Sequence, residues 1–282
     1  MRDDRPSLTA AFVAFARGIG VRGEAPDPVA GGLVPAPFGR LLDAVGRSRG
    51  LRPALRGMSL GMIDHITLRT TAIDRALRTA LSQGTDQVVV LGAGLDARAW
   101  RMPELGDADV YEVDHPASQA YKRERVGHLQ PLARAVHFVS CDFERERIGD
   151  ALAASGHDAS RPTFWIWEGV TMYLRRASVV ASLGVMDERS APGSELVVTY
   201  VLPEYVPLLG DAVKSVVHGV FQAFGEPLIG GVEPEEMAGL LRGAGFDPVS
   251  DTDSVDWARA EGIGTVLPFF FRAERLAVAR RR

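Results

Sequence analysis

The residues best placed to do chemistry are a glycine-rich turn after an apolar run and an isolated acid further along. Val88–Leu91 is apolar without alternation, as expected of a strand buried on both faces. Gly92, Ala93 and Gly94 follow directly, and the glycines allow a sharp turn with no side chain between backbone and ligand. Asp114 stands twenty residues after Gly94, at the end of a second strand-like run. The pattern indicates a nucleoside site, because the turn admits the ligand and the carboxylate accepts hydrogen bonds from ribose hydroxyls.

This pattern leaves three alternatives open. Gly-x-Gly-x-x-Ala also occurs in dinucleotide-binding sheets, and a tight strand-to-helix turn needs no ligand at all. A short-chain NAD-dependent oxidoreductase would need a Tyr-x-x-x-Lys pair, and the sequence has none. A regulatory module that binds a cofactor without catalysis is the third alternative.

The elements that must position these residues alternate between strand-like and helical stretches. Strand-like runs are found at Gln87–Leu91, Ala108–Val113, Val136–Ser140, Thr163–Trp167 and Glu195–Val201. Helical stretches lie between them near 115–129, 144–155 and 174–190. This alternation predicts a doubly wound α/β fold, in which a mostly parallel sheet carries helices on both faces. Two late strands, the last at Leu276–Ala279, predict an antiparallel hairpin at one sheet edge.

The regions flanking this core predict one domain with two additions. Short helices are expected at Ala10–Gly18 and Phe38–Val45, separated by an irregular stretch, Gly23–Gly39. A longer helix is expected over residues 60–83, with Ile63, Ile66, Ile73 and Leu77 as its inner stripe. The chain therefore divides into an N-terminal helical lid (1–84), a core (85–202 and 232–282) and a substrate-side insertion (203–231).

Composition excludes several classes of function. The formal net charge of −4 gives no reason to expect a nucleic acid partner. The single cysteine, Cys141, can form no intrachain disulfide, which favours a reducing compartment. No apolar stretch approaches the roughly 20 residues that span a bilayer, and the charged N-terminus is a poor signal peptide. We therefore expect a cytoplasmic enzyme without a membrane partner. The histidines lack metal-ligand spacing, so no metal is expected.

Three further stretches fit with the glycine turn. They are Tyr-Glu-Val-Asp-His-Pro at 111–116, Ser-Cys-Asp-Phe at 140–143 and Trp-Ile-Trp-Glu-Gly-Val-Thr-Met-Tyr-Leu at 165–174. Together with Leu-Gly-Ala-Gly-Leu-Asp-Ala-Arg at 91–98, they resemble the leucine carboxyl methyltransferase family, especially its bacterial branch. The resemblance implies a seven-stranded, Rossmann-like class I methyltransferase fold with S-adenosylmethionine as cofactor.

The resemblance also implies roles for residues at the amino acid end of the cofactor. Arg69 matches the arginine that grips the methionyl carboxylate, a suitable partner for a guanidinium fork. Gly92, Ala93 and Gly94 match the turn against which the cofactor packs. Glu168 matches the carboxylate near the charged end of the cofactor.

The remaining cofactor residues match the nucleoside end. Asp114 matches the acid that binds the ribose, and Asp142 with Phe143 matches the pair that holds the adenine. Capping of the next helix is an alternative role for Asp142. The chain departs from the family at Ala97, where a threonine is usual, and at Thr199-Tyr200, where an acid is common.

The expected reaction is in-line methyl transfer that esterifies a carboxylate on a small molecule or peptide. Methylation of a hydroxyl on an aromatic or polyketide natural product, in secondary metabolism, is the alternative acceptor. A carboxylate needs no base at pH 7, whereas a phenol does. Tyr173 and His218 are the catalytic candidates on the substrate side, although each could be an ordinary packing or surface residue. The oligomeric state is left open.

Overall fold

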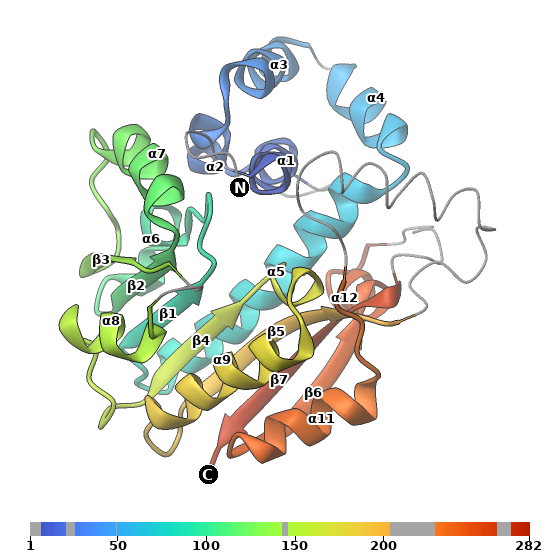
Figure 1. Ribbon diagram of the computed structural model, residues 1–282. Helices are drawn as coiled ribbons and strands as arrows, with labels where there is room; N and C mark the ends of the chain where they lie inside the picture. The colour runs from blue at the N-terminus through green and yellow to red at the C-terminus, as the bar shows by residue number, and fades with distance from the viewer. Residues whose placement is uncertain (1–6, 21–25, 49, 143–145, 204–228, 264–271) are drawn as a thin grey trace.

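The computed structural model describes residues 7–20, 26–48, 50–142, 146–203, 229–263 and 272–282. Its centre is a seven-stranded sheet in the order β3-β2-β1-β4-β5-β7-β6 (Figure 1). The first five strands are mutually parallel, and β7 runs antiparallel to both of its neighbours. The predicted mostly parallel α/β sheet is therefore confirmed.

The parallel strands begin and end close to where the apolar runs predicted them. They are β1 (Gln87–Leu91), β2 (Asp109–Asp114), β3 (Ala135–Ser140), β4 (Thr163–Trp167) and β5 (Glu195–Val201). Every residue of β1 and β4 is buried, because both strands have neighbours on either side and packing on both faces. The bounds of β1, β4 and β5 equal the predicted ones, since a fully buried strand requires an unbroken apolar run.

Helices cover both faces of this sheet. Those that follow the glycine turn are α6 (Arg98–Arg101), α7 (Pro116–Val126), α8 (Ile148–Ala154), α9 (Arg176–Glu188), α11 (Pro234–Gly243) and α12 (Ser254–Ala260). Two short 3-10 turns add η1 (Pro103–Leu105) and η2 (Thr171–Tyr173). Among the described residues, no helix combines the length and apolar character that crossing a bilayer requires.

Alternate strand residues supply two separate hydrophobic cores. Val88 and Val90 face the core that also contains the inner stripe of α5 (Met62–Ser82). Val89 and Leu91 face the opposite core, which is closed by α8, α9 and α11. The predicted stripe of α5 is confirmed, because all four of its residues are at most 4% exposed. The glycine turn thus follows a strand held firmly from both sides.

The N-terminal helices gather at the end of the molecule away from the C-terminus (Figure 1). They are α1 (Leu8–Ile19), α2 (Pro28–Leu33), α3 (Ala36–Arg47) and α4 (Leu51–Met58), and α5 leads from them to the sheet. Of these, α1 packs against α2, α3 and α5, whereas α4 buries no residue. The N-terminal region therefore joins the core mainly through α1 and α5.

Two of these helices differ from the expectation. The stretch Gly23–Gly39 was predicted to be irregular, yet it contains α2 and the start of α3. The Gly and Pro content of this stretch favoured an irregular structure, but Asp27 caps the N-terminus of α2. Its carboxylate accepts hydrogen bonds from the backbone N–H groups of Val29 and Ala30, both at 2.9 Å. Pro28 occupies the first helical position, where its missing N–H costs nothing. Helix α4 was not predicted.

The late strands lie at the predicted sheet edge but are not joined by a simple hairpin. β6 (Phe246–Asp253) forms the edge, and β7 (Glu274–Arg281) lies between it and β5. The two strands pair antiparallel as predicted, but a helix, α12, begins directly after β6. Asp253 and Asp256 form a capping box that starts this helix.

Most of the predicted insertion, residues 203–231, lies outside the described residues, which resume at Ile229. The backbone N–H groups of Ile229 and Gly230 donate to the Met172 carbonyl at 3.0 and 2.9 Å. The N–H of Val232 donates to the carbonyl of Val201 at 2.9 Å. Both contacts place the end of the insertion at the carboxyl end of the parallel sheet.

The core stripe of α5 gives a stability prediction. Leu77 is fully buried, so Leu77→Ala removes packed methyl groups and should lower the free energy of unfolding by about 2–5 kcal/mol. Met58→Ala is the control, because Met58 is 78% exposed and its loss should change that free energy by less than about 0.5 kcal/mol. Urea unfolding of both variants measures the difference, and equal values would contradict the assignment of this stripe to the core.

Candidate functional site

A cavity of about 180 Å³ opens at the carboxyl ends of the central strands. Its walls come from α1, the turn after β1, the end of β2 and the loop after β4. Seven of the residues predicted from the sequence line it, namely Arg69, Gly92, Ala93, Gly94, Asp114, Glu168 and Tyr173. Four separate stretches of the chain therefore meet at one place.

The glycine turn is shaped by close contacts on both sides. Gly92 and Gly94 have positive φ angles of 67° and 48°, which favour glycine. A Cβ on Gly92 would lie 2.6 Å from a methyl carbon of Val170, and one on Gly94 would lie 3.3 Å from Ala10. Hence these glycines bring the turn against the loop after β4 and against α1, in addition to leaving room for a ligand.

Asp114 connects the end of β2 to this turn. One carboxylate oxygen accepts the backbone N–H of Gly94, and the other accepts that of His115 at 2.6 Å. Burial raises the pKa of Asp114, although these two hydrogen bonds favour its ionised form. The carboxylate still lines the cavity, so it fixes the turn and can also accept a ligand hydroxyl.

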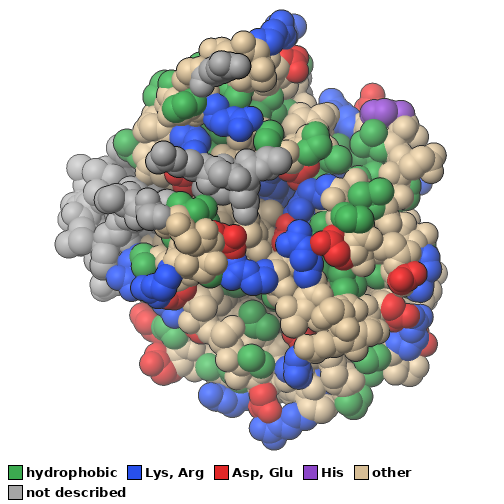
Figure 2. All heavy atoms as spheres, turned by 180° about the vertical axis from the view of Figure 1, so that it is seen from behind, with side chains coloured by type: hydrophobic (Ala, Val, Ile, Leu, Met, Phe, Trp, Pro, Cys, Tyr) green, Lys and Arg blue, Asp and Glu red, His purple; other side chains and the backbone are tan. Residues whose placement is uncertain are grey.

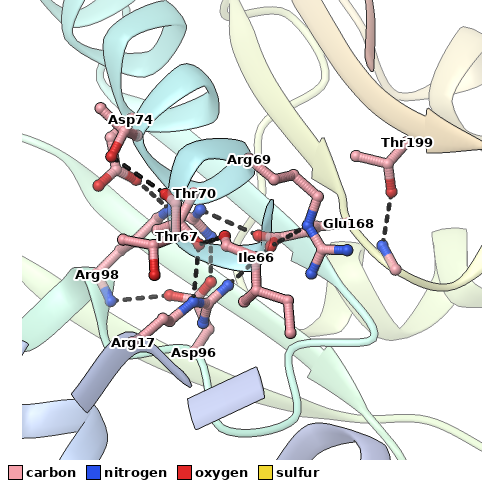
Figure 3. A network of polar contacts seen from close by, with 12 residues as sticks. Arg17, Ile66, Thr67, Arg69, Thr70, Asp74, Asp96, Arg98, Glu168 and Thr199 are labelled. Atoms are coloured by element: carbon pink, nitrogen blue, oxygen red, sulfur yellow. Dashed lines mark hydrogen bonds and ion pairs between the residues drawn. The ribbon is translucent and has the colours of Figure 1, made fainter. Parts of the chain in front are cut away.

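Glu168 is surrounded by three arginines (Figure 3). Its Oε1 accepts Arg17 Nη2 at 2.8 Å and Arg69 Nε at 3.0 Å, and its Oε2 accepts Arg98 Nη2 at 3.0 Å. The side chains of all four residues are at most 7% exposed. Burial alone would raise the pKa of Glu168, but the three positive charges hold it far below its usual range. This carboxylate is thus a permanent anion and no general base.

A second layer of carboxylates holds the arginines in turn. Arg98 donates to Asp74 at 2.6 Å and also to Asp96, and these two acids raise its pKa despite its burial. Arg17 Nε donates to Thr70 at 3.0 Å. The guanidinium groups are therefore fixed on several sides before any ligand arrives. On the surface, by contrast, acidic and basic side chains are interspersed across the rear face of the molecule (Figure 2).

Two guanidinium nitrogens remain available at the cavity. Arg17 Nη1 and Arg69 Nη2 form no hydrogen bond with the described residues, and both arginines line the cavity. Donors of this kind suit a carboxylate, which guanidinium groups bind well. The sequence analysis identified Arg69 but assigned no role to Arg17, whose signal was a single charge inside the apolar run of α1.

One predicted residue does not line the cavity, and two others lie outside the described residues. Asp142 does not line it, although the N–H of the preceding Cys141 donates to the Asp114 carbonyl at 3.0 Å. The backbone N–H of Asp142 donates to Glu146 at 2.7 Å. Phe143 and His218 lie outside the described residues. The adenine role of Asp142 and Phe143 and the catalytic role of His218 therefore stay predictions.

The two departures from the family pattern have local consequences. Ala97 is buried at the start of α6, where no side chain caps the helix. Thr199 holds the loop after β4, because its Oγ1 accepts the N–H of Gly169 at 2.8 Å. Tyr200 points elsewhere: it is buried and donates to Asp251 on β6. An acid at Thr199 would remove the hydroxyl that orients this loop.

Metal and base chemistry have few candidates here. Within the described ranges, no group of three or more His, Cys, Asp and Glu side chains could hold a metal ion. No histidine is among the described residues that line the cavity. Trp165 and Trp167 are fully or almost fully buried in the core closed by α9, so they pack in the core and do not face the cavity.

Comparison with known proteins decides the family. The sequence model of leucine carboxyl methyltransferase matches residues 10–186. The chain belongs to the leucine carboxyl methyltransferase family. This confirms the resemblance drawn from the four motifs, and the matched range contains Arg17, Arg69 and Glu168.

Two curated relatives and one solved structure are also similar to this chain. Two relatives share the name "putative S-adenosyl-L-methionine-dependent methyltransferase". The one from Streptomyces coelicolor is 42% identical over 46% of this chain and 43% of its own length. The one from Mycobacterium avium is 36% identical over 67% of this chain and 63% of its own length. The chain thus spans about half the length of these two relatives. A DUF574 family protein from Streptomyces avermitilis has the same fold, with a TM-score of 0.64, 17% identity and 99% coverage of both chains.

The arginine cluster predicts a large effect of Glu168. Glu168→Gln leaves three buried cations without their shared anion and should lower the free energy of unfolding by about 3–5 kcal/mol. The exposed pair Arg147–Glu188 provides the control, because Glu188→Gln should change the free energy of unfolding by less than about 0.5 kcal/mol. Chemical denaturation at pH 7 measures both values, and a small effect of Glu168→Gln would contradict the account.

The same carboxylate predicts a pH dependence of stability. Because the pKa of Glu168 is lower in the folded than in the unfolded protein, its contribution is complete above the ordinary glutamate pKa and is lost on acidification. We therefore expect the wild type to lose more unfolding free energy than Glu168→Gln as the pH falls below about 4.5. Denaturation curves at several acidic pH values test this, and parallel losses would contradict it.

Proposed function

We propose that the chain transfers a methyl group from S-adenosylmethionine to a carboxylate on a small molecule or peptide. The observation that carries the proposal is the cavity itself. It combines a glycine turn and the Asp114 carboxylate with the two available guanidinium nitrogens of Arg17 and Arg69. An acid that can accept ribose hydroxyls and a pair of donors for a carboxylate suit the two polar ends of this cofactor.

The residues present fit the cofactor as a donor set. Arg69 and Arg17 would hold its carboxylate, and Asp114 would accept from its ribose. Gly92 and Gly94 would let it approach the backbone, because neither glycine carries a side chain between turn and ligand. When bound, S-adenosylmethionine supplies a methyl group activated by a sulfonium. The names of the relatives support the same cofactor.

The work of this chain is then to orient two reactants and exclude water. Alignment of reactants can lower a barrier by roughly 7–11 kcal/mol. The carboxylates that line the cavity are already engaged: Glu168 by arginines, Asp96 by Arg98, and Asp114 by two backbone N–H groups. An acceptor that is ionised at neutral pH needs no proton removed. This favours a carboxylate acceptor, with a pKa of ~4, over a phenol of ~10.

A hydroxyl on an aromatic compound is the second candidate acceptor. Val13, Val170 and Tyr173 also line the cavity and provide an apolar surface that an aromatic ring could contact. His218 would then be the candidate base, from the insertion that the described residues do not include. The absence of Tyr-x-x-x-Lys from the sequence argues against an NAD-dependent oxidoreductase.

Calorimetric titration with S-adenosylhomocysteine and with NADH tests the cofactor. We expect S-adenosylhomocysteine to bind and NADH not to bind. Asp114→Asn should weaken binding of S-adenosylhomocysteine about tenfold, since it replaces a charged acceptor with a neutral one. Asp247→Asn is the control, because Asp247 lies in an exposed pair with Arg282 on the far edge strand β6. Binding of NADH alone would overturn the proposal.

The chemistry of the product tests the acceptor. The enzyme is incubated with methyl-tritiated S-adenosylmethionine and one of three acceptors: a peptide with a free C-terminal carboxylate, the same peptide with a C-terminal amide, or 4-methylphenol. We expect label only on the free carboxylate, released as methanol by mild base, because esters hydrolyse and aryl ethers do not. The rate should stay flat from about pH 6 to 8, where a carboxylate does not titrate. Base-stable label on the phenol would favour the second candidate.

A further inference from the structure

The guanidinium group of Arg69, which lines the cavity, forms hydrogen bonds with two carboxylates. Nε donates to Glu168 at 3.0 Å, and Nη1 donates to Glu274 at 2.7 Å. Glu168 follows β4, whereas Glu274 is the first residue of β7, more than one hundred residues later. Nη2 remains, and it lies 3.8 Å from the position of a Cβ on Gly169. The planar guanidinium therefore has two of its edges fixed by carboxylates and one edge directed at the loop that lines the cavity.

Glu274 is itself held in place by α5. Its second carboxylate oxygen contacts His65 Nε2, and His65 lies one helical turn before Arg69 on the same helix. The His65 ring packs against Trp257 of α12, with ring centroids 5.5 Å apart. Glu274 is 9% exposed, and His65 is 3% exposed. A carboxylate with both oxygens engaged in a buried setting has little freedom to move.

The ionisation of Glu274 is strongly favoured. Burial alone would raise its pKa, but the charge of Arg69 and the hydrogen bond with His65 lower the pKa to about 2. Glu274 is not among the residues that line the cavity. It therefore does not contact a ligand bound there, and Arg69 is the cavity-lining residue with which it pairs.

We propose that Glu274 is a positioning residue, which, together with His65, orients the Arg69 guanidinium so that Nη2 meets the carboxylate of the cofactor. This rests on the proposed function, since it assigns Arg69 to that carboxylate. The C-terminal strand β7, which lies outside the matched family range, thereby contributes to cofactor affinity. A purely structural role, in which Glu274 only ties β7 to α5, is the competing explanation.

Two ligands separate these explanations. S-adenosylhomocysteine carries the amino acid carboxylate, whereas 5′-methylthioadenosine keeps the nucleoside and the thioether but lacks that group. Glu274→Gln should weaken binding of S-adenosylhomocysteine about tenfold or more, because a charged partner of Arg69 is lost. Binding of 5′-methylthioadenosine should change less than about twofold, since Arg69 does not contact it.

Glu195→Gln is the matched control. Glu195 lies on the neighbouring strand β5, is 8% exposed and pairs with Arg280 at 2.6 Å, but at the opposite end of the β5–β7 pair. It should leave the affinity for both ligands unchanged. If Glu274→Gln fails to fold, Glu274→Asp takes its place in the test. This variant keeps the negative charge but shortens its reach, so it should also weaken binding of S-adenosylhomocysteine and leave binding of 5′-methylthioadenosine nearly unchanged.

A double-variant cycle links the effect to Arg69. If Glu274 acts through Arg69, Arg69→Gln and Arg69→Gln/Glu274→Gln should bind S-adenosylhomocysteine equally weakly. Equal losses for both ligands in Glu274→Gln, or no loss for either, would overturn the proposal. If the wild type bound neither ligand, the proposed function itself would fail, which is a different outcome.

Discussion

The site depends on one buried carboxylate, Glu168, which is shared by three arginines. Removing four charges from water is costly, and mutual attraction offsets that cost only when geometry and further hydrogen bonds are good. Here Asp74, Asp96 and Glu274 supply the additional partners. The result is a set of guanidinium groups whose orientation is decided by the protein. Under the proposed function, a ligand carboxylate would meet donors that lose little freedom on binding.

This cluster also joins distant parts of the chain. Arg17 comes from α1, Arg69 from α5, Arg98 from α6 and Glu168 from the loop after β4. The N-terminal helices carry few other polar contacts to the sheet, and α4 buries nothing. Consequently the interaction that shapes the ligand site also holds α1 over the glycine turn. Ala10 against Gly94 is the packing counterpart of this ionic link.

Much of the architecture could be predicted because it depends on patterns local to the sequence. A strand buried on both faces is rich in consecutive apolar residues, so β1 and β4 are recognisable from their local sequence. Helix α2 was not predicted because its N-terminal cap, Asp27, lies in a stretch rich in Gly and Pro. The bounds of the edge strand β6 were not predicted for a different reason: the strand has one exposed side, carries several acids and contains a bulge near Pro248.

The position of Asp114 at the cavity was predictable because the acid follows a strand-like run at a fixed distance from the glycine turn, whereas Arg69 was identified from the resemblance to the family. The site was not predictable where residues act together across the fold. Glu274 resembles any acid at the start of a strand, and Arg17 resembles an interruption in an apolar helix. Their meaning appears only when β7 and α1 are placed beside α5. A sequence motif can indicate a residue that could contact a ligand. The partners that orient this residue come from other parts of the chain, so they are found only in the tertiary structure.

The most direct measurement is a crystal structure of the protein with S-adenosylhomocysteine bound. The account predicts that the ligand carboxylate lies within hydrogen-bonding distance of Arg17 Nη1 and Arg69 Nη2, with the ribose hydroxyls at Asp114. A ligand whose carboxylate points away from both arginines, or whose nucleoside occupies another cavity, would contradict it.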